Sequence, residues 1–432
     1  MLVCLITLDC VRSDHLGGAL TPALNALSPE WTTFEQAFAQ SQNTLSSHLT
    51  MLTSNYLFQH GVYSNYAQKA LPPHALPARI KALGWDCQAI TGVDFLAQFL
   101  GNQVGGRDPR FPDPSDQSLV ARVTRRLYGR RTPAEKTLAR GLRWLAAKGR
   151  RRDAFLWLHL FDAHMVYEAP PAFTKAHVTA EGGGGKSVSD QLKERGWFSP
   201  RFPEYDQPLP LEHFPQRYRA AVAYEDSRLG EFVAALKARG WWDDALVVVT
   251  ADHGECLMGD HAVYCAHKKL FDTTVHVPLR VKFPRGRHAG ETVGALVQHV
   301  DFATTVASLA GFEEPLYMGR DLAAVAEGRD PGHAVVFSEH VDNFLRCARD
   351  RDWIYVEEVP GQPNKWGLAM EPGNLFRRDA APAPPGSDPH ARRLKEALDG
   401  LLSGRPEVAA AWGESREAEA EMAERLKELG YM

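Results

Sequence analysis

The segment LVCLITLD (residues 2–9) is an apolar run of aliphatic and β-branched residues that ends in a carboxylate. This composition predicts a strand that is buried on both faces. Two later runs, AFLWLHLFD (154–162) and ALVVVTAD (245–252), have the same character and also end in an aspartate. The carboxyl ends of parallel strands meet at one edge of a sheet, which is where α/β proteins bind their ligands. The three runs therefore predict an α/β fold with acidic residues gathered at one edge.

Helical patterns separate these runs, as a parallel sheet requires. LPARIKALG (76–84) predicts a helix that ends at glycine, and WDCQAITG (85–92) predicts the next strand. TPAEKTLARGLRWLAAKG (132–149) is amphipathic with proline in its first turn, and YRAAVAYEDSRLGEFVAALKARG (218–240) predicts a long helix. We expect a large, mostly parallel central sheet covered by helices on both faces.

The chain divides into a predicted catalytic α/β domain (1–328) and a small C-terminal α+β subdomain (329–432). Within the first, residues 173–216 contain EGGGGKS and several prolines, and a loop of this length predicts a lid or substrate loop. It is not a phosphate loop, because no strand precedes its glycines. In the second, we expect two antiparallel strands, a proline-rich linker and a closing helix, which are HAVVFSEHV (333–341), RDWIYVEEV (351–359), APAPPGSDP (381–389) and EAEAEMAERLKELG (417–430).

The overall composition excludes several kinds of protein. A net charge of −4 gives no argument for a nucleic-acid-binding surface, and no apolar run reaches the length of a membrane span. The six cysteines lack CxxC spacing and the first residues read as a core strand, so we expect reduced thiols and a cytoplasmic protein. A homo-oligomer is compatible with this composition.

Three strand-end turns carry possible metal ligands. These are Asp9, Asp162 with His164, and Asp252 with His253. A single aspartate after a strand is more often a helix cap, but three such turns at one edge favour a metal centre. We expect Gly254 to permit the sharp bend that turns Asp252 and His253 toward one point.

Several ordered motifs give the chain a resemblance to a known family. The motifs are LITLDCVRSDHLG, TPALNALSPEWTTFEQAFAQ, NTLSSHLTMLTS, HGVYSN, LHLFDAHMVYEAPP, ALVVVTADHGE, GDHAVYCAHKKLFDTTVHVPL, HVDFATTVASLAG and MGRDL. Together they resemble the sulfatase branch of the alkaline-phosphatase superfamily. The resemblance covers nearly the whole chain except the 100–130 and 173–216 insertions.

The resemblance implies a divalent metal ion, which could be Mn, Zn, Ca or Mg. Its implied ligands are Asp9, Thr44, Asp252 and His253. Many sulfatases have a second aspartate beside the first, but here Cys10 stands in that place, which suggests fewer ligands or a different metal. We favour one metal site and leave open a second formed by Asp162, His164 and His267.

The nucleophile departs from the family pattern. Sulfatases carry a cysteine in C-x-P-S-R that is oxidised to formylglycine, whereas this chain has TLSSH (44–48). This resembles a T-L-P-S-H variant in which threonine attacks directly. Thr44 has few side-chain rotamers, and a metal would activate its hydroxyl. Ser46 is the second candidate, while Ser47 and His48 are expected to cap the following helix and polarise the surroundings of the nucleophile.

The resemblance also implies residues that contact the substrate. His164 and His267 are the expected catalytic histidines, which contact the transferred group or protonate the leaving oxygen. The expected substrate-binding residues are Asn65, His48, Lys268 and Asp162. A structural role for His164, half-buried beside a loop, is the competing interpretation.

Together these features predict a metal-dependent phosphoester hydrolase with a covalent Thr44 intermediate. The expected substrates are phosphodiesters, phosphonate monoesters or phosphomonoesters of a small molecule, glycan or lipid. The alternatives are a sulfate-ester hydrolase that works without formylglycine, a phosphotransferase to a glycan or lipid, and a non-catalytic binding protein.

Overall fold

The chain was analysed as a computed structural model. The structure describes residues 1–65, 67, 69–105, 131–149, 153–179, 185–195, 206–260, 263–340, 344–362, 364, 375–378, 388–404 and 406–407.

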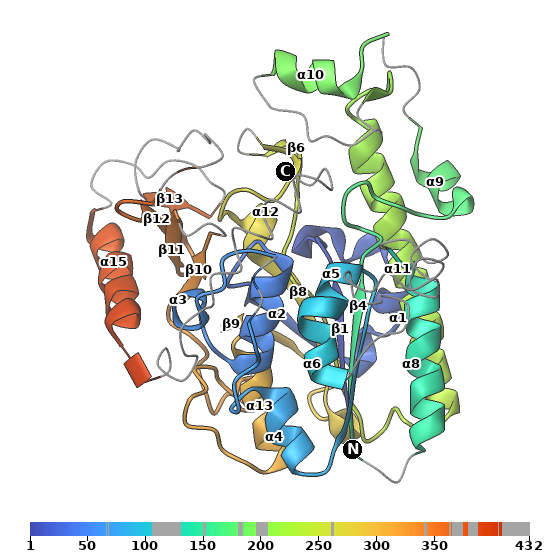
Figure 1. The fold of residues 1–432 in the computed structure, drawn as a ribbon, viewed down its shortest axis with the longest axis vertical. Coiled ribbons are helices and arrows are strands. Elements are labelled where there is room, and N and C mark those ends of the chain that lie inside the picture. Colours follow the sequence, from blue (N-terminus) through green and yellow to red (C-terminus); the bar gives the residue numbers. More distant parts are fainter. Residues whose placement is uncertain are drawn as a thin grey trace, which may run out of the picture.

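A seven-stranded sheet forms the centre of the molecule, in the order β3-β4-β1-β5-β8-β2-β9 (Figure 1). The strands are β3 (Asp86–Thr91), β4 (Ala154–Leu160), β1 (Leu2–Leu8), β5 (Leu246–Ala251), β8 (His276–Lys282), β2 (Thr32–Phe38) and β9 (Thr292–Gln298). Strand β8 runs antiparallel to both of its neighbours, and the other pairs are parallel. The structure confirms the mostly parallel sheet and the four strands predicted from apolar runs.

Alternate residues of β4 show how helices cover both faces. A Cβ added to Gly141 of α8 (Ala134–Lys148) would meet the side chains of Leu156 and Leu158. On the opposite face, Trp157 lies 4.7 Å from the ring of His48 in α2 (Thr44–Thr53), measured between centroids. Helices α1 (Pro22–Ala26), α8 and α11 (His213–Ala238) pack together, as do α2, α4 (Leu76–Ala82) and α13 (Asp301–Ala310). The predicted helices at 76–84, 132–149 and 218–240 are thereby confirmed.

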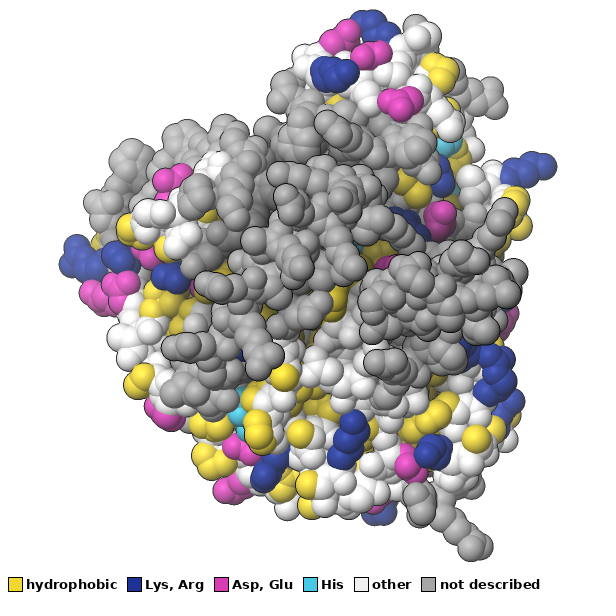
Figure 2. All heavy atoms as spheres, viewed as in Figure 1, with side chains coloured by type: hydrophobic (Ala, Val, Ile, Leu, Met, Phe, Trp, Pro, Cys, Tyr) yellow, Lys and Arg dark blue, Asp and Glu magenta, His cyan; other side chains and the backbone are white. Residues whose placement is uncertain are grey.

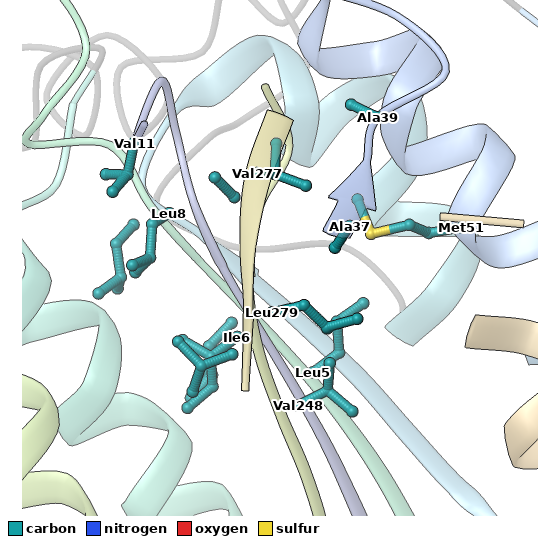
Figure 3. Close-up of a cluster of buried hydrophobic side chains, with 14 of the residues drawn as sticks. Leu5, Ile6, Leu8, Val11, Ala37, Ala39, Met51, Val248, Val277 and Leu279 are labelled. Carbon is teal, nitrogen blue, oxygen red and sulfur yellow. The ribbon is translucent and has the colours of Figure 1, made fainter. Parts of the chain in front are cut away.

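The core lies between the sheet and these helices. Strand β1 is buried at all seven positions, because it is the third strand of the sheet and is covered from both sides. Figure 3 shows Leu5 close to Val248 and Leu279 on one side of the sheet, while Ile6 points the other way. Burial of such aliphatic side chains is the main favourable term in folding.

The strand register brings the candidate ligands together. Leu8 of β1 pairs with both Leu160 of β4 and Ala251 of β5, so all three strands end at one level. Asp9 and Asp252 are the residues that follow two of these strand ends, and the Asp9 amide donates to the Leu160 carbonyl at 3.0 Å. The polar edge predicted from the three runs is therefore present.

The C-terminal region forms a separate antiparallel sheet. It contains β10 (Val336–Glu339), β11 (Leu345–Arg349), β12 (Trp353–Glu358) and β13 (Leu375–Arg377), covered by α15 (Asp388–Ser403). The two predicted antiparallel strands are confirmed as β10 and β12, and β11 lies between them and pairs with both. Most of the predicted linker and the predicted closing helix (417–430) lie outside the described residues, and the boundary at 328 stays a prediction.

The 173–216 segment contains two short helices, α10 (Val188–Glu194) and the end of α9 (Pro171–His177), and the first residues of α11, which stand above the sheet edge in Figure 1. Residues 180–184 and 196–205, including most of the glycine run, lie outside the described residues. The proposed lid role stays a prediction.

The remaining strands and α-helices are short. They are β6 (Cys256–Asp260), β7 (Val263–Ala266), α3 (Leu57–His60), α5 (Asp94–Leu96), α6 (Asn102–Gly105), α12 (Asp272–Val275) and α14 (Leu322–Ala326). On the face shown in Figure 2, the described acidic and basic side chains are interspersed. No helix in the described part of the chain is long and apolar enough to cross a membrane.

Candidate active site and metal centre

The structure places the four implied metal ligands in one buried cluster. The Thr44 hydroxyl donates to Asp9 Oδ2 at 3.3 Å and lies 3.5 Å from His253 Nε2. Asp252 Oδ2 lies 3.6 Å from the same His253 nitrogen. All four side chains are nearly inaccessible to solvent. Residues separated by more than 200 positions are thus brought within hydrogen-bonding distance by the sheet edge and by α2.

Helix α2 holds Thr44 at its first position. The preceding Asn43 has an extended backbone, and its Oδ1 accepts the Ser46 amide, which is the arrangement of a helix N-cap. Asn65 accepts the Leu45 amide at 2.8 Å and so fixes the first turn from outside the helix. The helix dipole places partial positive charge at this end, which favours negative charge on Thr44.

The other hydroxyls of this helix point elsewhere. Ser46 donates to the Val62 carbonyl at 2.7 Å, and Ser47 donates to the Ser41 carbonyl at 3.0 Å. Thr44 is therefore the hydroxyl of TLSSH that contacts Asp9. The expectation that Ser47 and His48 cap the helix is wrong, because both lie inside α2 and Asn43 is the cap.

The two carboxylates have free coordination capacity. Asp252 Oδ1 accepts the amides of Cys10 and His253, whereas Asp252 Oδ2 and Asp9 Oδ1 are buried without a hydrogen-bond partner among the described residues. Burial and then Asp9 raise the pKa of Asp252 to about 6. Burial opposes ionisation of Asp9, but neighbouring histidines, His164 first, hold its pKa well below the ordinary value. Two buried carboxylates with unsatisfied oxygens fit a divalent cation.

Gly254 is needed for a reason other than the sharp bend that was expected there. Its φ lies outside the left-handed region, but a Cβ there would lie 2.2 Å from the Thr273 carbonyl oxygen. Glycine is thus required because the backbone of α12 passes close by at Thr273. A left-handed conformation is found instead at Cys10, with φ of 62°, directly after Asp9.

The two predicted catalytic histidines lie beside the cluster. His164 can supply a ligand atom within 4.8 Å of those of Asp9 and Cys10, and the ring of His267 lies 4.4 Å from that of His253. Burial lowers the pKa of His164 to about 4 and holds that of His267 well below its ordinary value. His164 Nδ1 is 2.7 Å from the Met165 carbonyl, which can only accept, so this nitrogen carries the proton.

The predicted substrate-binding residues Lys268 and Asp162 have different surroundings. Lys268 lies close enough to Glu255 to lower that residue's pKa, against the larger effect of burial. Asp162 Oδ2 accepts the Ala134 amide at the start of α8, and its own amide donates to Glu225. No candidate ligand cluster among the described residues includes Asp162, so the second metal site that was left open for Asp162, His164 and His267 is not found.

His48 lies behind Thr44 and is fully buried. Its Nδ1 contacts the Thr44 carbonyl at 2.7 Å, and its Nε2 contacts the Thr7 hydroxyl at 2.9 Å. Burial holds its pKa well below the ordinary value. With both nitrogens engaged inside the protein, His48 positions Thr44 through its backbone.

Three residues of the site were not singled out from the sequence in the roles that the structure shows. His159 Nε2 lies 3.1 Å from Asp9 Oδ2. Cys10 Sγ lies 3.8 Å from His253 Nδ1 and 3.9 Å from His267 Nδ1. Glu255 is buried, and its Oε1 is 3.5 Å from His267 Nδ1. A polar residue inside an apolar strand, such as His159, was the available signal.

The chain is similar to known proteins in both sequence and structure. The sequence model of the family described as Sulfatase matches residues 3–312. Arylsulfatase K of Rattus norvegicus is 27% identical over 174 residues, which are 37% of this chain and 30% of that protein. The chain thus spans less than a third of the length of this curated relative.

Solved structures share the fold over nearly the whole chain. The phosphonate monoester hydrolase SpPMH from Silicibacter pomeroyi has a TM-score of 0.65 at 19% identity, with 96% of each chain covered. BT4656, solved with its substrate D-glucosamine-2-N,6-O-disulfate, has a TM-score of 0.69 at 15% identity, covering 96% of this chain and 99% of that one. These likenesses establish an alkaline-phosphatase-like fold.

Proposed function

The chain belongs to the sulfatase family, and from that premise we propose that it is a metal-dependent phosphoester hydrolase in which Thr44 is the nucleophile. The observation that supports this most directly is the Thr44 hydroxyl, which is buried and contacts both Asp9 and His253. A threonine cannot be oxidised to formylglycine, so the residue in the nucleophile's place must act through its own hydroxyl.

The proposed ligands of the metal are Asp9, Thr44, Asp252 and His253, whose unsatisfied oxygens fit a divalent cation. Such an ion lowers the pKa of a bound hydroxyl and offsets negative charge on the oxygens of a phosphoryl group. Candidate ions are Mn, Zn, Ca and Mg.

In the proposed reaction, Thr44 Oγ1 attacks phosphorus while the bond to the leaving oxygen breaks. A threonine phosphoester forms, and water then cleaves it at phosphorus. Asn43 and Asn65 hold the first turn of α2, so the hydroxyl is oriented before substrate binds. His48 fixes the Thr44 carbonyl from the other side.

The leaving oxygen requires a proton. The Nδ1 proton of His164 is used by the Met165 carbonyl, which leaves its Nε2 as an acceptor. His267 can instead relay a proton from the buried acid Glu255, whose pKa burial raises to about 8: Glu255 gives its proton to His267 Nδ1 as His267 Nε2 gives its own to the leaving oxygen. Lys268 contributes positive charge beside this pair.

The second candidate function is sulfate-ester hydrolysis, which is favoured by the likeness to arylsulfatase K and to BT4656. Phosphotransfer to a glycan or lipid hydroxyl would use the same threonine phosphoester, with an alcohol in place of water.

A four-substrate assay separates these functions. The purified protein, loaded with Mn or Zn, is given aryl esters of sulfate, phosphate, phosphodiester and phosphonate type. We expect turnover of the phosphorus esters and a phosphothreonine peptide containing Thr44 when the reaction is quenched. Turnover of the sulfate ester alone, or an active Thr44→Ala protein, would exclude the proposed mechanism.

A further inference from the structure

His159 lies within β4, yet both of its ring nitrogens serve polar partners. The side chain is fully buried. Its Nδ1 lies 2.9 Å from the Thr7 hydroxyl, and its Nε2 lies 3.1 Å from Asp9 Oδ2. It therefore connects the interior of the sheet to the metal centre.

The protons of this network can be assigned, beginning at His48. Its Nδ1 contacts the Thr44 carbonyl, which can only accept, so Nδ1 carries the proton. Its Nε2 contacts a hydroxyl, and neither contact is a carboxylate. A buried imidazolium with neutral partners is costly, so His48 is neutral and its Nε2 accepts.

Thr7 then has no proton left for His159. Its single hydroxyl proton goes to His48 Nε2 at 2.9 Å. The indole of Trp157, which can only donate, gives its proton to the same Thr7 oxygen at 3.1 Å. The contact between Thr7 and His159 is therefore donated by His159 Nδ1.

With Nδ1 donating to Thr7, the other ring nitrogen of His159, Nε2, faces the Asp9 carboxylate. A separation of 3.1 Å suits two atoms that bind the same cation at about 2 Å each. The candidate ligand atoms of Asp9, His159 and Asp252 all lie within 4.8 Å of one another. Asp9 Oδ1 and Asp252 Oδ2 have no partner in the described part of the chain.

We propose that His159 binds the metal ion through Nε2, together with Asp9 and Asp252. The hydrogen bond from Nδ1 to Thr7 then acts as the outer partner that orients a metal-binding histidine. His253 has the same arrangement, since its Nδ1 lies 3.0 Å from the Gly254 carbonyl and its Nε2 faces the cluster.

The proposal narrows the choice of metal. Two imidazole nitrogens beside two carboxylates suit a transition ion such as Zn or Mn, whereas Ca and Mg prefer oxygen ligands throughout. The competing arrangement is a buried ion pair in which His159 Nε2 carries a proton and no metal bond forms.

Cobalt substitution tests the proposal on the full-length protein. A histidine bound to Co²⁺ through Nε2 gives a paramagnetically shifted, exchangeable Nδ1 proton signal in the NMR spectrum. We expect such signals from His159 and His253, and His159→Gln should abolish one of them. The dissociation constant for Co²⁺ or Zn²⁺ is measured by competition with a chromophoric chelator.

Two further variants separate ligation from structure. Thr7→Val keeps the imidazole but removes its outer partner, and should weaken metal binding about 10- to 100-fold, with a larger loss for His159→Gln. Trp157→Phe removes the hydrogen bond from the indole to Thr7 and should change the dissociation constant less than about threefold, because the His159 bond to Thr7 remains.

The proposal rests on the metal dependence proposed above, but its readouts do not require turnover. If the protein binds no metal, the proposed function fails with it. If metal binds but His159→Gln keeps both shifted signals and its affinity, only the role of His159 is refuted. Should His159→Gln not fold, ¹⁵N-histidine labelling of the wild-type Co²⁺ protein decides, since an unshifted His159 signal would refute ligation.

Discussion

Replacing Asp252 by asparagine should stabilise the metal-free protein at neutral and alkaline pH. Burial and then Asp9 raise the pKa of Asp252 from 3.8 to about 6. A carboxyl group whose pKa is raised by folding opposes folding once it ionises, so the cost begins above pH 4 and is complete above pH 6. The asparagine keeps Oδ1 for the amides of Cys10 and His253 but carries no charge.

The size of the effect follows from the shift. At about 1.4 kcal/mol per pKa unit, the rise in the pKa of Asp252 from 3.8 to about 6 limits the stabilisation by Asp252→Asn to about 3 kcal/mol at pH 8. The same linkage gives a gain of about 1 kcal/mol at pH 4.5, where most of the group is protonated in the folded protein. With metal at a thousandfold excess over its dissociation constant, wild type gains about 4 kcal/mol that the variant lacks. With metal bound, wild type should therefore be more stable than Asp252→Asn.

The assay is urea unfolding followed by tryptophan fluorescence, at pH 4.5 and pH 8, with a chelator or with Zn. Asp301→Asn is the matched control. Asp301 is buried and accepts from the amides of Gln298 and Arg320 and contacts His333, so its loss should destabilise the protein in every condition. If Asp252→Asn destabilises the chelated protein at pH 8 as Asp301→Asn does, the electrostatic reasoning is wrong.

Three further substitutions test the surroundings of the site. Asn65→Ala should lower kcat about tenfold or more and cost about 1 kcal/mol of unfolding free energy, because the Leu45 amide loses its acceptor; unchanged kcat would contradict a positioning role. Gly254→Ala should weaken zinc binding and lower the unfolding midpoint, since its Cβ would lie 2.2 Å from the Thr273 carbonyl oxygen. Gly400→Ala, where a Cβ would meet no atom within 4 Å, should leave zinc affinity unchanged. Arg349→Met should lower the unfolding free energy in urea by about 2 kcal/mol, because Asp272 and the Leu270 carbonyl lose the buried guanidinium while Arg378 still pairs with Asp272. A loss below about 1 kcal/mol would show that this pair does not tie the C-terminal sheet down.

The apolar runs were sufficient to predict the centre of the fold. Strands such as β1 and β5 are buried along their whole length, so their sequences carry an unbroken hydrophobic signal. Strands β2, β8 and β9 were not predicted. β2 and β9 contain exposed positions, and β8 carries Pro278, so these segments lack that signal. Their pairing depends on partners distant in sequence.

The surroundings of individual polar residues were harder to predict from the sequence. Asp162 also follows a buried strand, but it lies two residues beyond the end of β4 whereas Asp9 directly follows β1, and its carboxylate accepts the Ala134 amide at the start of α8. His159 was not singled out from the sequence, because its neighbours in sequence are apolar, while its neighbours in space are Thr7 and Asp9. A strand residue's role depends on what packs against its face, which local sequence does not encode.

The sequence by itself determined the chemistry that is available: acidic residues and a histidine after buried strands, and hydroxyls without a cysteine in TLSSH. Only the tertiary structure decided which groups meet. Thr44 reaches Asp9 because it occupies the first position of α2, while Ser46 and Ser47, two and three residues further along the helix, donate to the carbonyls of Val62 and Ser41. The helix rotates successive side chains by about 100°, so neighbouring hydroxyls of equal chemistry face different surroundings.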